Sequence, residues 1–309
     1  MAEQGAAAAT TTMVTVAGGD FQMGSASFYS DEAPVHQRAV EPFEIDLHPV
    51  TNRQFAEFVD ATGYVTTAER PLDPAEFPEA DPADLVPGGL VFTGTRHPVD
   101  LSDWRQWWKW GRGANWRAPY GSGSGISGRQ DHPVVQVSFE DATTYAAWAG
   151  KRLLTEAEWE FAARGGLDGF DYAWGEEARP GGQLMANTWQ GRFPYLNTGA
   201  NGWVGTSPVM SFPPNGFGLY DCIGNVWEWT SSYYGARQEP PAACCGPQHR
   251  SSETEASPEP GSHRPRRVIK GGSHLCAPEY CLRYRPAARS PETEDTSTTH
   301  IGFRCARSV

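Results

Sequence analysis

Glycine and proline limit what this chain can fold into. The sequence has 34 glycines and 25 prolines among 309 residues, together about 19%, against about 12% in average proteins. Both residues interrupt regular elements, so a helical bundle is excluded and an irregular, turn-rich backbone is favoured. Glycine shows no three-residue period, which excludes collagen. Twelve Trp, 14 Phe and 11 Tyr supply large apolar surfaces, which excludes a wholly disordered chain.

Charge and hydropathy exclude further classes. The formal net charge of −12 disfavours a general nucleic-acid binder. No stretch approaches the roughly 18 apolar residues of a membrane span, and the N-terminus lacks the basic start and apolar run of a secretory signal. Six cysteines are too few for a disulfide scaffold. We therefore expect a cytoplasmic protein with free thiols, made of a disordered tail at 1–12 and one compact domain at 13–309.

Local sequence patterns predict short helices and short strands that are interspersed along the chain. Thr51, Ser138 and Thr155 are N-cap residues, and Gln54 and Glu158 complete capping boxes with the first and the last. The expected helices begin at Thr51, Phe139 and Thr155 and end at Gly63, Ala149 and Gly165, respectively. The expected strands are a hairpin within 14–23 and single strands at 43–47, 268–270 and 301–307.

The six cysteines divide by their surroundings. Cys222 and Cys305 are predicted to be buried free thiols, and the adjacent Cys244 and Cys245 to be incidental loop thiols. Cys276 and Cys281 differ, because Arg283 and Arg285 follow closely and favour a thiolate. Spacing alone leaves four possibilities for this pair: a redox disulfide, a zinc site, a Cu(I) site or two structural thiols.

Around this pair the sequence resembles a known family. The ordered motifs include Gly18-Gly-Asp-Phe-Gln-Met-Gly24, Thr155-Glu-Ala-Glu-Trp-Glu160, Pro213-Pro-Asn-Gly-Phe-Gly-Leu-Tyr220, Gly224-Asn-Val-Trp-Glu-Trp229 and Gly302-Phe-Arg-Cys305. They resemble the formylglycine-generating enzymes, which are sulfatase-modifying factors, over residues 13–309. Most of these motifs mark only the broad superfamily. The cysteine pair, followed by Tyr284-Arg-Pro-Ala-Ala-Arg-Ser290, marks the catalytic branch.

The resemblance implies a fold and an activity. The fold would be a single α+β, C-type-lectin-like domain, low in regular secondary structure and with long loops. The activity would be oxidation of the cysteine in an unfolded sulfatase segment, Cys-x-Pro-x-Arg, to Cα-formylglycine with molecular oxygen and a thiol reductant. Cys276 and Cys281 would hold Cu(I), which carries the oxygen chemistry while the protein places one Cβ–H beside it.

The resemblance also implies roles for other residues. Those expected to line the catalytic site are Ser273, Trp227 and Tyr280. Those expected to bind the substrate peptide are Arg289, Ser290, His300 and Ala68. Glu69 and Asp73 are candidates for an acidic pocket that takes the substrate arginine, with solvated loop carboxylates as the alternative. Without the resemblance, core aromatics, a turn hydroxyl and an ion pair would explain Trp227, Tyr280, Ser273 and Arg289.

The resemblance also implies two calcium sites, whose ligands are assigned here by position in the sequence. One would use Asp221, Glu228 and the carbonyls of Gly224 and Val226, which are hard oxygen ligands in a tight turn. The other would use Asn187, Asn201 and the carbonyls of Thr188 and Trp203. The second set contains no carboxylate and is expected to be weaker. Turn formation is the alternative explanation for both asparagines.

The chain departs from the family pattern at several positions. Disulfide cysteines of secreted members are replaced here by Ala147, Ala163 and Pro286, which agrees with a cytoplasmic protein. His300 stands where the family often has Asn. The alternative function is a non-catalytic, lectin-like binding module, which has no need of a thiol pair. An iron-dependent sulfoxide synthase is ranked last, because the chain lacks the His-x-x-x-His-x-Glu motif of those enzymes.

Overall fold

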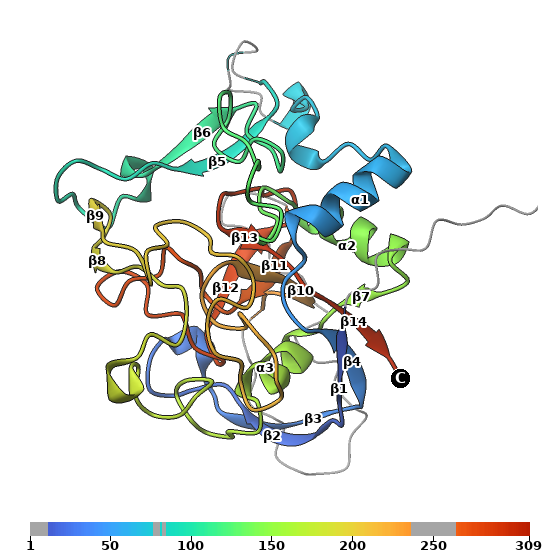
Figure 1. The fold of residues 1–309 in the computed structure, drawn as a ribbon, viewed down its shortest axis with the longest axis vertical. Helices are drawn as coiled ribbons and strands as arrows, with labels where there is room; N and C mark the ends of the chain where they lie inside the picture. Colours follow the sequence, from blue (N-terminus) through green and yellow to red (C-terminus); the bar gives the residue numbers. More distant parts are fainter. Residues whose placement is uncertain (1–11, 77–80, 82–84, 236–263) are drawn as a thin grey trace, which may run out of the picture.

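The computed structural model describes residues 12–76, 81, 85–235 and 264–309. The structure contains two four-stranded sheets, and most of the remaining backbone is loops (Figure 1). The first sheet has the order β1-β4-β14-β7 and the second β12-β11-β10-β13. The strands of the first are Met13–Val16 (β1), Phe43–Asp46 (β4), Cys305–Ser308 (β14) and Arg152–Leu153 (β7). Those of the second are Arg289–Thr293 (β12), Arg266–Lys270 (β11), Trp227–Tyr233 (β10) and Ile301–Gly302 (β13).

Smaller elements surround the two sheets. Three two-stranded pairs are Gly19–Met23 (β2) with His36–Val40 (β3), Gly88–Phe92 (β5) with Trp108–Arg112 (β6), and Gly191–Arg192 (β8) with Leu196–Asn197 (β9). The α-helices are Asn52–Thr62 (α1), Phe139–Trp148 (α2) and Glu156–Arg164 (α3). The 3-10 turns that matter below are Ser30–Glu32 (η1) and Thr67–Glu69 (η2).

The helix predictions are confirmed with their caps. The Thr51, Ser138 and Thr155 side chains each accept the backbone N–H three residues later, and a reciprocal side-chain bond completes all three capping boxes. Gly63 and Gly165 end α1 and α3 in the left-handed conformation, with φ of 68° and 58°. Local sequence sets these boundaries, because each bond lies within one helical turn.

Two strand predictions are wrong. The expected hairpin within 14–23 does not form, because β1 pairs with β4 and β2 pairs with β3. Gly18 turns the chain from one sheet to the next, and a Cβ there would lie 2.3 Å from the Val40 carbonyl oxygen. The expected terminal strand at 301–307 is divided into β13 and β14, which belong to different sheets. The strands at 43–47 and 268–270 are confirmed as β4 and β11.

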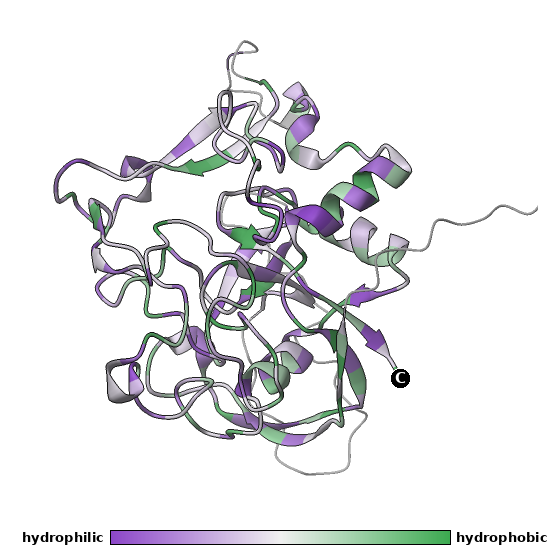
Figure 2. Ribbon diagram, in the orientation of Figure 1, coloured by the Kyte–Doolittle hydropathy of each residue, from purple (hydrophilic) through white to green (hydrophobic). Residues whose placement is uncertain are grey.

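The core combines aromatic rings with buried charges. Trp116, Trp159 and Trp229 are at most 1% exposed. Arg304 is fully buried and forms a bidentate pair with Glu228, at 2.8 Å from each carboxylate oxygen. Figure 2 shows hydrophilic and hydrophobic segments interspersed through the centre of the molecule. The interior therefore depends on paired charges as well as on apolar contact.

None of the helices in the described part of the chain has the length and apolar character that crossing a bilayer requires.

Removing the buried cation tests this dependence. Arg304→Ala should lower the free energy of unfolding by about 3–5 kcal/mol, because Glu228 would remain buried without its partner. Arg307→Ala is the control, since its pair with Glu44 leaves the Arg307 side chain 55% exposed. That change should cost less than about 1 kcal/mol. Urea unfolding measures both, and equal losses would contradict the expected importance of the buried pair.

Candidate functional site

Cys276 and Cys281 meet in the wall of a cavity of about 320 Å³. Their Sγ atoms are 3.0 Å apart, close enough for one thiol to donate to the other. Cys276 is buried, whereas Cys281 is partly exposed to the cavity. No disulfide joins them, and both are free thiols.

The Gly271-Gly272-Ser273 turn positions the first cysteine. Gly272 has a φ of 70°, and a Cβ there would come within 3.0 Å of the backbone of Arg283 and Tyr284. The turn and the segment after Cys281 therefore pack directly against one another. The Ser273 backbone N–H then points to the Cys276 Sγ at 3.4 Å, and the Ser273 hydroxyl accepts the Leu275 N–H.

The two thiols differ in acidity. Burial raises the pKa of Cys276 well above that of an ordinary thiol. The hydrogen bond from Cys276 and the nearby Arg283 guanidinium lower the pKa of Cys281. Cys281 is therefore the more acidic thiol of the pair.

Most of the predicted site residues line this cavity. They are Ser273, Trp227, Tyr280, Ser290, His300 and the two cysteines. Arg283, which was expected to favour a thiolate, also lines it, and five further lining residues were not predicted: Tyr29, Trp107, Trp108, Phe193 and Leu275. Trp107 and Trp108 belong to a tryptophan-rich stretch at 104–116, and this local composition was the one signal that pointed to them. Tyr29 carries no local signal, because 247 residues separate it from Cys276.

An aromatic wall covers one side of the thiols. The Tyr280 ring stacks on Phe193 with a centroid distance of 4.4 Å and meets Trp107 edge-on at 5.3 Å. Trp108 tilts over the His300 imidazole at 4.8 Å. Burial lowers the pKa of His300 to about 3 and raises that of Tyr280 to about 12, so both side chains are neutral near pH 7.

Arg289 and Ala68 do not line the cavity. Arg289 is 2% exposed, and its guanidinium pairs with Glu156 at 2.9 Å beneath β12. The ion pair considered as its alternative explanation is present, but it is buried. Ala68 is 2% exposed within η2, and it lines neither this cavity nor the second cavity described below. The peptide contacts expected of these two residues therefore find no support in their positions.

A second cavity, of about 730 Å³, lies further along β6. Trp108 lines the first cavity, whereas Trp110 and Arg112, on the same face of the strand, line the second. Asp73 lines this second cavity together with Asp295, a carboxylate that was not predicted. Glu69 does not line it, since its carboxylate caps η2 by accepting the Thr66 N–H.

The calcium set without a carboxylate, which includes Asn187 and Asn201, shows a buried oxygen without a partner. The Asn187 Oδ1 atom is buried and accepts no hydrogen bond, while its Nδ2 donates to the Gly205 carbonyl at 3.0 Å. The turn that carries Asn201 and Trp203 thus lies next to Asn187. An orphaned amide oxygen beside carbonyls fits a hard cation such as Ca²⁺.

The calcium set with Asp221 and Glu228 fits less well. Both oxygens of Glu228 already accept from Arg304, and Oε2 also accepts from the Trp159 indole. Asp221 accepts the Met210 N–H, and burial raises the pKa of its carboxyl to about 6. A cation bound with Gly224 and Val226 would have to share Glu228 with Arg304. This set stays a prediction.

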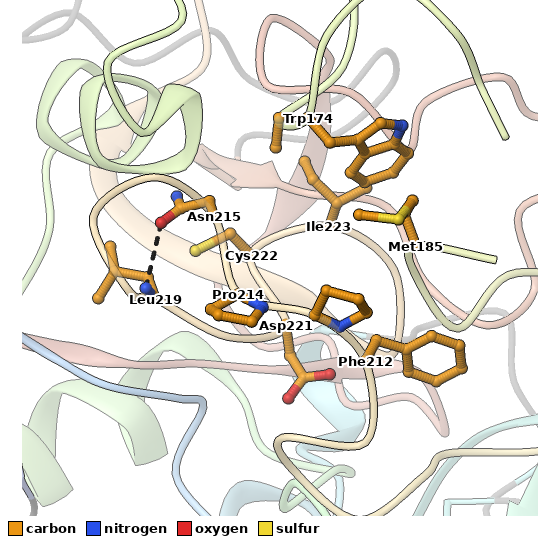
Figure 3. A pocket seen from close by; sticks show the side chains of 11 residues that line it. Trp174, Met185, Phe212, Pro214, Asn215, Leu219, Asp221, Cys222 and Ile223 are labelled. Atoms are coloured by element: carbon orange, nitrogen blue, oxygen red, sulfur yellow. Dashed lines mark hydrogen bonds between the residues drawn. The ribbon is translucent and has the colours of Figure 1, made fainter. Parts of the chain in front are cut away.

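The other described cysteines match their predicted character. Cys222 and Cys305 are buried free thiols, and burial raises the pKa of both. Cys222 lines a cavity of only about 20 Å³, roughly one water molecule, beside Asp221 and Asn215 (Figure 3). Cys244 and Cys245 lie outside the described residues, as does the predicted tail except Thr12.

Alkylation tests which of the two thiols has the lower pKa. Iodoacetamide at neutral pH should modify Cys281 before Cys276, because the thiolate is the nucleophile and Cys281 has the lower pKa. Cys276→Ser should slow the reaction, since the thiol that donates to Cys281 is lost. Peptide mapping by mass spectrometry measures the order, with Cys222→Ser as the control. Faster modification of Cys276 would contradict the assignment.

Comparisons with known proteins agree with the sequence motifs. The family model of the sulfatase-modifying factor enzyme 1-like domain matches residues 1–309. The chain is 61% identical to the formylglycine-generating enzyme of Mycobacterium tuberculosis, over 96% of this chain and 97% of that protein. It is also 40% identical to the inactive Cα-formylglycine-generating enzyme 2 of Bos taurus, over 96% of this chain and 88% of that one.

A solved structure supports the fold. PvdO from Pseudomonas aeruginosa has a TM-score of 0.58 at 24% identity and covers 96% of this chain, which covers 94% of PvdO. The predicted α+β, C-type-lectin-like fold of the sulfatase-modifying factors is confirmed. The match over the full chain and the identity to these relatives show that the chain belongs to the family of formylglycine-generating enzymes, the sulfatase-modifying factors.

Proposed function

We propose that this protein oxidises the cysteine of a Cys-x-Pro-x-Arg segment in an unfolded sulfatase to Cα-formylglycine. Oxygen is the oxidant, a thiol supplies the remaining electrons, and Cys276 and Cys281 hold Cu(I). The observation that carries the proposal is the pair of free thiols 3.0 Å apart in the wall of a cavity. Identity of 61% to a formylglycine-generating enzyme supports it.

The residues of the pair fit a copper(I) ion. Thiolates are soft ligands that select Cu(I). Within the described residues, no group of three or more His, Cys, Asp or Glu side chains could hold a metal. The pair therefore offers two sulfur ligands, a donor set that leaves a position for a substrate thiolate. Copper, when bound, would supply the oxygen chemistry that no side chain here provides.

The surrounding side chains would prepare the pair for that role. Arg283 favours the thiolate form of Cys281, and the Ser273 N–H holds the Cys276 sulfur. Tyr280, Phe193 and Trp107 form an apolar wall beside the pair, which would exclude water from the substrate cysteine. His300 and Ser290, which also line the cavity, would contact the peptide.

The two cavities match the length of the motif. The cysteine and arginine of Cys-x-Pro-x-Arg are four residues apart, about 13 Å in an extended chain. Trp108 and Arg112 are also four residues apart on β6, and they line the first and second cavities, respectively. A peptide that runs along β6 with its cysteine at the thiols would bring its arginine to the cavity lined by Asp73 and by Asp295, of which Asp295 already pairs with Arg264.

The alternative is a non-catalytic, lectin-like binding module. The 40% identity to an inactive relative means that overall similarity does not separate the two functions. The thiol pair separates them, since binding alone has no need of it. We place the reaction in the cytoplasm, because Cys222 and Cys305 are free as expected in a reducing compartment.

Conversion of a peptide tests the oxidase. Incubation with copper, oxygen, a thiol reductant and a Cys-x-Pro-x-Arg peptide should convert the peptide cysteine to an aldehyde, detected by mass spectrometry. Cys276→Ser and Cys281→Ser should abolish both conversion and stoichiometric Cu(I) binding. Cys222→Ser should retain both, because Cys222 lies in a separate small cavity. An unchanged peptide with folded, copper-loaded protein would refute the proposal.

We also propose a calcium ion at Asn187, Thr188, Asn201 and Trp203. At free calcium about 100-fold above Kd, binding to the native state alone adds about 2.7 kcal/mol of stability. A chelator should therefore lower the Tm measured by calorimetry. Asn187→Ala should lower the Tm and abolish its response to the chelator, because the orphaned oxygen is removed. If a chelator leaves the Tm of the parent protein unchanged, this calcium site is contradicted.

A further inference from the structure

The segment that carries Cys281 has little regular structure of its own. Between the turn at Cys276 and the start of β12 at Arg289 the chain forms turns and irregular backbone. The Cys281 N–H donates to the Ala277 carbonyl at 2.7 Å, a bond within the same loop. Such a local bond closes the turn but does not hold the turn against the rest of the protein. The spacing of the two thiols therefore depends on contacts from outside the loop.

One such contact comes from a tyrosine far away in the sequence. The N–H of Leu282, the residue after Cys281, donates to the Tyr29 Oη at 3.0 Å. Tyr29 lies between β2 and β3, and its side chain also lines the cavity of the thiol pair. A single side chain thus contacts both the cavity and the backbone next to Cys281.

Charged and aromatic contacts fix Tyr29 in turn. The Arg283 guanidinium lies 3.9 Å from the centroid of the Tyr29 ring and pairs with Asp31 at 3.1 Å. Arg285 pairs with Glu32 through two bonds of 2.5 and 2.9 Å, and both side chains are fully buried. Because these two ion pairs lie directly after the Tyr29–Leu282 bond in both segments, the segment 28–32 and the cysteine loop form one packed unit.

We propose that Tyr29 is a positioning residue, whose hydroxyl holds the Leu282 amide and thereby sets the distance between the Cys276 and Cys281 thiols. The inference rests on the thiol pair being the reactive centre of the proposed function. It does not depend on which metal or peptide the pair binds. Tyr29 takes no part in the chemistry, and it acts only through the backbone of the loop.

The variant Tyr29→Phe isolates the hydroxyl. Phenylalanine keeps a ring beneath Arg283 and removes only the acceptor for the Leu282 N–H. Tyr234→Phe is the matched control, because the Tyr234 hydroxyl donates to Asp31 at 3.2 Å without contacting the cysteine loop. Asp31→Asn is a second test variant, which removes the charge that holds Arg283 against the Tyr29 ring.

A trivalent arsenical measures thiol spacing without copper or substrate. Phenylarsine oxide forms two As–S bonds with a pair of neighbouring thiols and releases one water, with no change of oxidation state. All proteins in the comparison carry Cys244→Ser and Cys245→Ser, so that the adjacent thiols do not compete for the probe. Competition with a small dithiol then gives the affinity of the Cys276–Cys281 pair.

Tyr29→Phe should weaken binding of the arsenical by about threefold to tenfold, the range expected for one lost hydrogen bond. The Tm of Tyr29→Phe should be close to the Tm of the Tyr234→Phe control. That control should bind the arsenical as tightly as the parent protein does. Asp31→Asn should weaken binding in the same direction. Unchanged affinity in Tyr29→Phe, or an equal loss in Tyr234→Phe, would overturn the proposal. A protein that fails to oxidise the peptide but shows these affinities would refute the proposed function alone.

Discussion

Buried ion pairs are the interaction on which this structure depends. The strands are short and the loops long, so backbone ladders alone connect few distant segments. Arg304, the residue before β14, pairs with Glu228 of β10, and Arg289 of β12 pairs with Glu156 of α3. Arg285 with Glu32 ties the cysteine loop to the N-terminal part of the chain. A charge buried in this way is stable only with its partner, so each pair brings two segments into one geometry.

The candidate site is assembled from parts that share no local sequence. Cys276 follows a glycine turn after β11, Trp108 begins β6, His300 precedes β13 and Tyr29 comes from the N-terminal part. An irregular backbone makes this possible, because loops can approach one another where regular elements would collide. The high glycine content therefore has a direct use, seen where Gly272 lets the Arg283 backbone pack against it. The result is two thiols beside an aromatic wall, in a cavity of about 320 Å³.

Local features were predicted well and non-local ones poorly. The caps at Thr51, Ser138 and Thr155 were correct, because a cap is a bond within one turn. The hairpin within 14–23 was wrong, since the alternating pattern of a strand does not say which strand it pairs with. Nor does that pattern show that Asp46, within the strand expected at 43–47, is fully buried and paired with Lys151.

The sequence by itself determined the fold family, the thiol pair and the starts of the helices. These depend on residue types at fixed spacing, which the chain carries whatever its tertiary structure. Only the tertiary structure decided that Arg289 is buried against Glu156 and that Glu69 is a helix cap. It also placed Asp295 and Asp73 in the lining of one cavity and brought Tyr29 to the cysteine loop. Which charges pair, and which side chains face a cavity, depends on contacts between segments that are far apart along the chain.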